Sequence, residues 1–175
     1  LEQVQALQDR QAAEPTKTAA PRGEVELKSA KEVDYKKLRD FLAAKDWKKA
    51  DEETWRVMCL AAGREKEGWL RVEDIENFPC ENLRTIDQLW VKYSDGRFGF
   101  SVQKDIYQEL GNTREYDAEI CWAFGDRVGW RQGGNWLNYD KLNWATNSAW
   151  TSPPGHFPRR GCLSSLVQRL VTCNI

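Results

Sequence analysis

The sequence predicts a single, mostly α-helical domain, and three observations support this fold class. Apolar residues recur at three- and four-residue spacing through much of residues 34–127, which is the period of an amphipathic helix. Residues that favour helix ends, such as Asp46 and Gly63, flank these stretches. Only the segment around Gly133-Gly134 combines short alternation with the double glycine of a β-hairpin.

The chain is expected to have three parts. Residues 1–33 are predicted to be a flexible N-terminal segment, because residues 13–24 carry two prolines and a glycine among alanines and threonines. Residues 34–160 are expected to form a helical core domain. Residues 161–175 form a C-terminal tail, in which the spacing of the leucines predicts a helix.

Two short helices with a tight joint are expected at the start of the core domain. Asp34 can cap the first and Asp46 the second, since both carboxylates can accept bonds from free backbone N–H groups. Gly63 would end the second helix. The pair is an αα-hairpin.

Three further helices are expected before the sequence becomes irregular after Gly125. Pro79 favours a helix start, and the apolar face that follows extends to Tyr93. A brief turn at residues 73–76 precedes it. Residues 98–102 fit either a strand or the beginning of a helix, and we favour a helix that continues to residue 111. Residues 116–124 form the third.

The region after Gly125 is expected to be irregular. Residues 128–137 are predicted to form a hairpin and residues 140–144 one helical turn. Residues 145–158 contain several prolines and are predicted to be a loop. A loop of this length in a compact domain commonly has a function.

Charge and cysteine content limit the classes of function. Lys+Arg 26 and Asp+Glu 27 give a formal net charge of -1, which argues against a nucleic-acid-binding protein. The five cysteines are odd in number and lack zinc-like spacing, so we expect a reducing compartment with mostly buried thiols. No apolar run approaches the ~20 residues that span a bilayer. Because the chain starts at Leu1, we expect that an upstream segment once preceded it.

Nine tryptophans beside a single histidine favour binding over catalysis. No nucleophile, phosphate-loop or metal-ligand motif accompanies His156. The tryptophans at helical spacing are expected to pack the core: Trp47, Trp55, Trp90 and Trp122. Those in the arginine-bearing late region are expected to support ligand binding: Trp130, Trp136, Trp144 and Trp150.

Flat indoles near arginines suit a ligand with a wide apolar plane and peripheral carboxylates, and a tetrapyrrole fits that description. Core packing of Trp130 or Trp136 is the alternative for the indoles. A solvated basic pair is the alternative for Arg159-Arg160.

Seven segments of the chain carry a family resemblance: Gly63–Leu70, Asp74–Leu83, Thr85–Ser94, Phe98–Gln103, Phe124–Arg131, Trp136–Tyr139 and Gly155–Pro158. They resemble the Genomes-Uncoupled family, the porphyrin-binding regulators of magnesium chelatase in oxygenic phototrophs. The similarity covers roughly residues 35–160 and departs from the family pattern at residues 143–154.

The resemblance implies a helical domain shaped like a cupped hand that binds protoporphyrin IX and Mg-protoporphyrin IX. It implies a regulator without catalytic residues, cofactor or metal site, which activates magnesium chelatase together with the large porphyrin-binding subunit. The implied location is the chloroplast, in the stroma and peripherally on plastid membranes, or the cytoplasm of a cyanobacterium. The alternative is a helical adaptor that binds a protein through its tryptophan-rich face.

The resemblance also places the site. Two loops line the family's pocket, and they correspond to residues 74–83 and 144–160 of this chain. The arginines are expected to bind the propionates. The implied porphyrin-binding residues are Phe78, Trp130, Arg131, Trp136, Phe157, Arg159 and Arg160.

Overall fold

A computed structural model describes residues 23–111, 115–159 and 164–175. Within these ranges the protein is mostly helical, as predicted, and none of the helices is long and apolar enough to cross a membrane. The elements are α1 (Lys36–Ala43), α2 (Trp47–Ala61), α3 (Val72–Glu76), α4 (Cys80–Tyr93), α5 (Phe100–Leu110), α6 (Ala118–Arg127), β1 (Arg131–Gln132), β2 (Asn135–Trp136), the 3-10 turn η2 (Tyr139–Lys141), α7 (Ser148–Thr151) and α8 (Ser164–Thr172).

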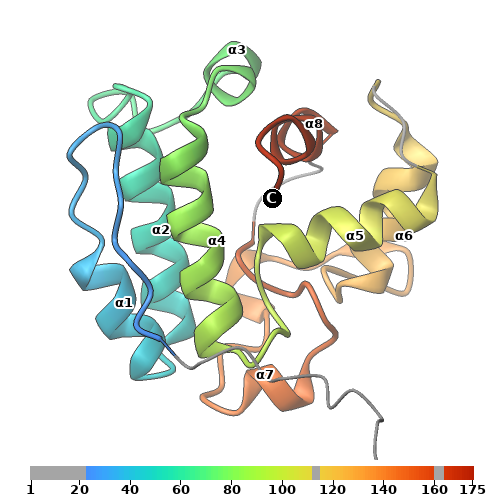
Figure 1. Ribbon diagram of the computed structural model, residues 1–175. Helices are drawn as coiled ribbons and strands as arrows, with labels where there is room; N and C mark the ends of the chain where they lie inside the picture. The colour runs from blue at the N-terminus through green and yellow to red at the C-terminus, as the bar shows by residue number, and fades with distance from the viewer. Residues whose placement is uncertain (1–22, 112–114, 160–163) are drawn as a thin grey trace, which may run out of the picture.

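The helices form two groups joined by α8 (Figure 1). In the first group α1 packs against both α2 and α4. In the second α5 packs against α6, which continues into the β1–β2 hairpin. Helix α8 contacts α3 on one side and α5 on the other, so it bridges the two groups.

An aromatic core holds the first group to the late part of the chain. Trp47 of α2 stacks on Trp90 of α4 with ring centroids 6.1 Å apart, and Phe98 meets Trp47 edge to face at 5.3 Å. The Trp90 indole donates a 2.9 Å hydrogen bond to Thr54 Oγ1, which satisfies its buried N–H group. The expectation that Trp47 and Trp90 pack the core is therefore confirmed.

The packed region begins before residue 34. The backbone N–H of Ala30 donates to Asn82 Oδ1 at 3.1 Å, and Thr85 Oγ1 donates to the carbonyl of Lys28 at 2.7 Å. Val33 is buried. Residues 23–33 therefore lie along α4, whereas residues 1–22 of the predicted flexible segment lie outside the described residues.

The predicted loop over residues 145–158 contains a short helix, α7. Arg97 stabilises it from the other side of the core, because its guanidinium donates to the carbonyls of Ala149 and Ser152 at 2.9 and 2.8 Å. Four residues are too few to show a helical period in sequence. The contacts with Arg97 that support α7 join residues far apart in sequence, so they leave no signal in the local sequence either.

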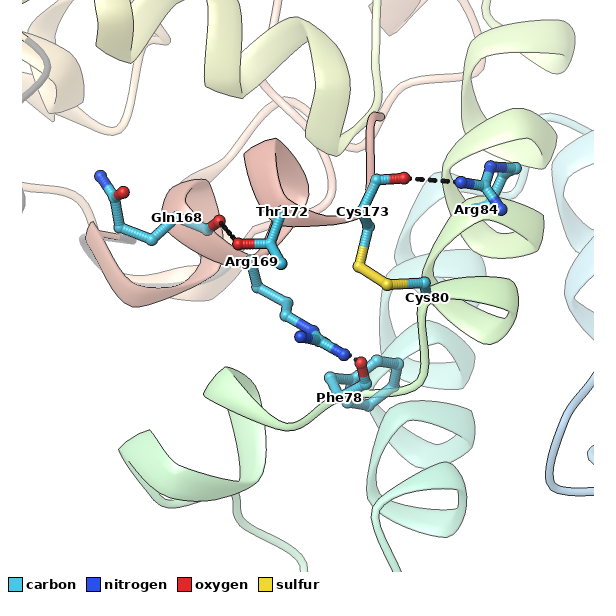
Figure 2. Close-up of a disulfide and its surroundings, with 7 residues drawn as sticks. All are labelled: Phe78, Cys80, Arg84, Gln168, Arg169, Thr172 and Cys173. Carbon is cyan, nitrogen blue, oxygen red and sulfur yellow. Dashed lines mark hydrogen bonds between the residues drawn. A yellow bond between two sulfur atoms is a disulfide. The ribbon is translucent and has the colours of Figure 1, made fainter.

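The expectation of reduced thiols is wrong for most of the cysteines. Cys80, at the start of α4, forms a disulfide with Cys173, just beyond α8 (Figure 2). Cys121 is also disulfide-bonded, and Cys59 is buried. Sequence spacing does not reveal such pairs: Cys80 and Cys173 are 93 residues apart, and only the packing of α8 brings their Cα atoms to 5.3 Å.

Hydrogen bonds reinforce the disulfide on both sides. Arg84 of α4 donates to the carbonyl of Cys173 at 2.6 Å, and Arg169 of α8 donates to the carbonyl of Phe78 at 2.7 Å (Figure 2). Lys104 of α5 donates to the carbonyl of Ile175 at 2.6 Å. The C-terminal helix is therefore fastened to both helical groups.

Candidate ligand-binding site

Indoles and guanidinium groups alternate where α6, the β1–β2 hairpin and residues 155–159 meet. We call residues 155–159 the late segment. We call the residues that carry the indoles and guanidinium groups the Trp–Arg cluster: Trp122, Trp130, Arg131, Trp136 and Arg159. The Arg131 guanidinium lies 5.7 Å from the Trp122 ring centroid and 5.6 Å from that of Trp136. The Arg159 guanidinium lies 4.6 Å from the Trp130 ring and 5.9 Å from Trp136. All four distances are within cation–π range.

The cluster has a solvent-accessible aromatic surface. Trp122 is 46% exposed and Trp136 is 43% exposed. Trp122 was expected in the core, so that expectation is wrong. The apolar period of a helix shows which residues share a face but not whether another element covers it.

The hairpin places Trp136 through a close approach to α6. Gly133 and Gly134 both have positive φ angles, +56° and +82°, as a tight two-residue turn requires. Arg131 then pairs with Trp136 across the two strands. The Trp136 ring lies over Gly125 of α6, where a Cβ atom would come within 2.6 Å of the indole. Gly125 therefore permits this position of the ring.

Trp130 belongs to the floor of the cluster. It is fully buried, its indole donates to the carbonyl of His156 at 2.7 Å, and its ring meets Phe124 edge to face at 5.4 Å. The core-packing alternative for Trp130 is thus the one observed, although the Arg159 guanidinium still lies over the ring.

Arg131 is held in place by groups of its own hairpin and of α6. Its guanidinium donates to Asp126 Oδ2 at 3.0 Å and to the carbonyl of Gly134 at 2.8 Å. These bonds fix the cation beside the two exposed indoles. A fixed guanidinium loses less entropy when a ligand anion arrives.

The backbone of Arg159 is held by a carboxylate that the sequence analysis did not identify. Asp51 of α2 accepts a 2.6 Å hydrogen bond from the backbone N–H of Arg159 and a 2.8 Å bond from the Tyr139 hydroxyl. Asp51 is fully buried. Its one sequence signal is an acidic residue on the apolar face of α2, between Ala50 and Thr54.

Two of the other predicted site residues lie outside the cluster. Phe157 is fully buried and stacks on Trp144 with ring centroids 4.5 Å apart, so its ring belongs to the core. Phe78 is buried between α3 and α4 beside α8 (Figure 2) and is not part of the cluster. Arg160 lies outside the described residues. Of the seven predicted residues, the structure brings together Trp130, Arg131, Trp136 and Arg159.

His156 supports the site and is not placed for acid–base chemistry. His156 is buried, with Nδ1 2.6 Å from the carbonyl of Val128. Burial lowers its pKa. Across the described ranges, no group of three or more His, Cys, Asp or Glu side chains is arranged to hold a metal ion.

A separate cavity of about 480 Å³ lies between the end of α2 and the α3–α4 turn, next to the first of the two predicted loops. Its Arg71 guanidinium is paired with Asp74 at 2.9 Å, as Arg131 of the cluster is with Asp126, and lowers the pKa of the Asp74 carboxyl to about 2. This cavity has mixed charge and lacks the exposed indoles of the Trp–Arg cluster. The cluster is therefore the better candidate for a flat anionic ligand.

Comparison with known proteins agrees with the fold and the motifs. The GUN4-like family model matches residues 28–172. The Ycf53-like protein of Synechocystis is 34% identical over 141 residues, covering 79% of this chain and 56% of that protein. The ycf53 protein of Porphyra purpurea is 36% identical over 146 residues, with 82% and 57% covered. The chain thus spans a little over half the length of these relatives.

One relative is named for its ligand, and two are solved structures. The chloroplastic tetrapyrrole-binding protein of Arabidopsis thaliana is 39% identical over 75 residues, which cover 42% of this chain and 28% of that protein. GUN4 from Chlamydomonas reinhardtii superposes with a TM-score of 0.67 at 26% identity, covering 85% of this chain and 93% of that one. Ligand-free Arabidopsis GUN4 gives 0.65 at 28%, with 80% and 95% covered.

Proposed function

Because the chain belongs to the GUN4-like family, we propose that it binds a tetrapyrrole at the Trp–Arg cluster. The observation that supports this most directly is the placement of two exposed indoles, Trp122 and Trp136, beside the guanidinium groups of Arg131 and Arg159. The Arabidopsis relative with a tetrapyrrole-binding name supports the same ligand class.

The chemistry of the ligand matches this surface in two ways. A porphyrin macrocycle is flat and apolar, so it loses contact with water when it stacks on an indole. Its propionates are anions that a guanidinium can bind with two parallel hydrogen bonds. The proposed ligands are protoporphyrin IX and Mg-protoporphyrin IX, with Trp136 as the stacking surface and Arg131, Arg159 and Arg160 as propionate partners.

The buried members of the predicted set have supporting roles in this proposal. Trp130 and Phe157 form the floor that keeps the late segment in place. Phe78 belongs to the first loop and contacts ligand only if a bound porphyrin extends toward α3. Since the site lacks a nucleophile or a metal cluster within the described residues, the proposed activity is binding and regulation.

In the cell, the proposed role is activation of magnesium chelatase through its large porphyrin-binding subunit. Family membership supports this role. Two relatives support the proposed location, since one is chloroplastic and another comes from a cyanobacterium. The chain would deliver or present porphyrin, and the chelatase would insert the magnesium.

Titration with protoporphyrin IX tests the ligand class and the site together. Binding should quench tryptophan fluorescence and shift the Soret band. Arg159→Gln should weaken binding about tenfold, because a charge-assisted hydrogen bond contributes on the order of 1.5–3 kcal/mol. Arg39→Gln is the matched control, since Arg39 lies on α1 and bonds to Asp40. Unchanged fluorescence and an unshifted Soret band in the wild type would refute the proposal.

A second candidate function is that of a helical adaptor for a protein partner. It is favoured by Trp150 on α7, 69% exposed, and by Trp69, 53% exposed, which both lie outside the Trp–Arg cluster. Tryptophan is a frequent anchor of protein interfaces. Capture of the chelatase large subunit in the absence of porphyrin, and its loss in Trp150→Ala, would support the adaptor over the porphyrin-dependent regulator.

A further inference from the structure

We propose that Asp51 is a positioning residue of the ligand site, which aims the Arg159 side chain by fixing its backbone. This inference rests on the proposed function and adds a residue that does not touch the ligand. Its starting observation is a fully buried carboxylate on α2 whose two oxygens accept hydrogen bonds from two distant parts of the chain.

Burial makes these two bonds important. A carboxylate removed from water is strongly destabilising unless donors satisfy it. Two of its donors are the Arg159 N–H at Oδ1 and the Tyr139 O–H at Oδ2, which lie 108 and 88 residues away in sequence. Asp51 is therefore not a helix cap or a local turn residue, since it connects α2 to two segments near the ligand site.

The contact with Arg159 is the last of a series that fixes the late segment. Gln103 of α5 donates from Nε2 to the carbonyls of Gly155 and Pro158 at 2.9 and 2.8 Å. The backbone N–H of Gly99 donates to the carbonyl of Phe157 at 3.0 Å. Gln103 of α5 thus binds carbonyl groups of the late segment. Asp51 of α2 instead accepts from the backbone N–H of Arg159.

The direction of the Arg159 side chain follows from this arrangement. With its N–H fixed against α2, its guanidinium lies 4.6 Å from the buried Trp130 ring and 5.9 Å from the exposed Trp136 ring. Without the Asp51 contact, the backbone at residue 159 can rotate. The cation then spends less time beside the exposed indole, and a ligand carboxylate meets it less often.

The contact with Tyr139 gives Asp51 a second, structural connection that the experiment must separate. The Tyr139 carbonyl accepts from the Trp144 indole at 2.9 Å, and Trp144 stacks on Phe157. Tyr139→Phe removes the Tyr139 hydroxyl that donates to Asp51 and leaves the contact between Asp51 and Arg159 intact. It is therefore the matched control for effects that pass through the η2 turn.

The experiment has one arm without ligand and one arm with protoporphyrin IX. In the ligand-free protein, hydrogen exchange of the peptide covering residues 155–159 should be fastest in Asp51→Ala, intermediate in Asp51→Asn and slow in the wild type and in Tyr139→Phe. Asparagine keeps one carbonyl acceptor for the Arg159 N–H, so Asp51→Asn also provides the measurement if Asp51→Ala does not fold. Unchanged exchange in both Asp51 variants would overturn the proposal whatever the binding data.

In the porphyrin arm, Asp51→Ala should weaken binding about tenfold, equivalent to ~1.4 kcal/mol, and Asp51→Asn about threefold. In an Arg159→Gln background neither should weaken it further, because residues that act as a unit are not additive. The positioning role would be overturned if the Asp51 substitutions weakened binding as much in the Arg159→Gln background as in the wild type. It would also be overturned if Tyr139→Phe weakened binding as much as Asp51→Ala does. Either result would leave porphyrin binding itself established. A wild-type protein that binds no porphyrin would overturn the proposed function and this inference with it.

Discussion

Helix α8 and the late segment 155–159 are both held across the molecule, but by different kinds of bond. The disulfide between Cys80 and Cys173 fastens α8, and arginine and lysine bonds to backbone carbonyls support it. The late segment is held by buried polar side chains, Asp51 and Gln103, and by its own aromatic layer.

The difference assigns two separate tasks to the two regions. A covalent link over 93 residues acts mainly by limiting the unfolded chain, so it contributes to global stability. The hydrogen bonds of the late segment each contribute less free energy, but they set the direction of one guanidinium. Stability and ligand affinity are therefore expected to respond to different substitutions.

The largest expected effect is the loss of the disulfide. Cys80→Ser combined with Cys173→Ser should lower the free energy of unfolding by about 4 kcal/mol, the size expected for a closed loop of roughly this length. Urea unfolding measures this value, with Cys59→Ala, which replaces a buried cysteine outside this disulfide, as the control. Affinity for protoporphyrin IX should change less than about twofold; a tenfold loss of affinity would show that the two regions are coupled.

An intermediate effect is expected at Gly125, where stability and porphyrin affinity should both fall. A Cβ atom there would lie 2.6 and 2.7 Å from the outer ring atoms of Trp136. Gly125→Ala should displace the indole, weaken porphyrin binding severalfold and destabilise the fold by about 1–3 kcal/mol, as overpacking does. Trp136→Phe, which lacks the outer ring, should restore the stability of Gly125→Ala. Binding that stays at wild-type strength in Gly125→Ala would remove Trp136 from the site.

The smallest expected effect is a pH dependence from His156. Burial is the main cause that lowers its pKa below the ordinary 6.5, and the nearby Arg159 charge acts in the same direction. Below pH 6.5 the unfolded chain binds a proton that the folded chain does not. Stability is therefore full above pH 6.5 and falls as the pH drops toward the lower pKa of the folded state, by at most about 1.4 kcal/mol per pH unit.

His156→Gln should flatten this slope in unfolding experiments between pH 6.5 and 5. Asp87 does not produce the same slope. Burial raises the pKa of Asp87, so its protonation favours the folded state as the pH falls. A slope that persists unchanged in His156→Gln would contradict the assignment.

Local patterns were sufficient to predict the longer helices and the hairpin, but not the four-residue helix α7. Asp46 caps α2 by accepting from the Lys49 N–H, and Pro79 precedes α4, both as expected from sequence. Gly133 and Gly134 turn the predicted hairpin. These features depend on neighbours within a few residues, so a single sequence contains them.

Features that depend on contacts between elements distant in sequence were predicted poorly. Trp122 has helical spacing but is half exposed, whereas Trp130 comes from an irregular stretch and is fully buried by the segment that contains His156. The carboxylate of Asp51 and the pairing of Cys80 with Cys173 depend on contacts over 88 to 108 residues. Motif resemblance named four residues that the structure brings together in the Trp–Arg cluster, but it did not name Asp51.

The disulfide also has a consequence for the order of events during synthesis. Cys80 leaves the ribosome 93 residues before Cys173, a delay of roughly 5–20 s at about 5–20 residues per second. Helices α1, α2 and α4 all lie within residues 36–93 and pack on one another, so this group can assemble during that interval with Cys80 still unpaired. The cross-link then closes on a partly folded chain, and an oxidant that acts too early would meet Cys59 and Cys121 before Cys173 has been made.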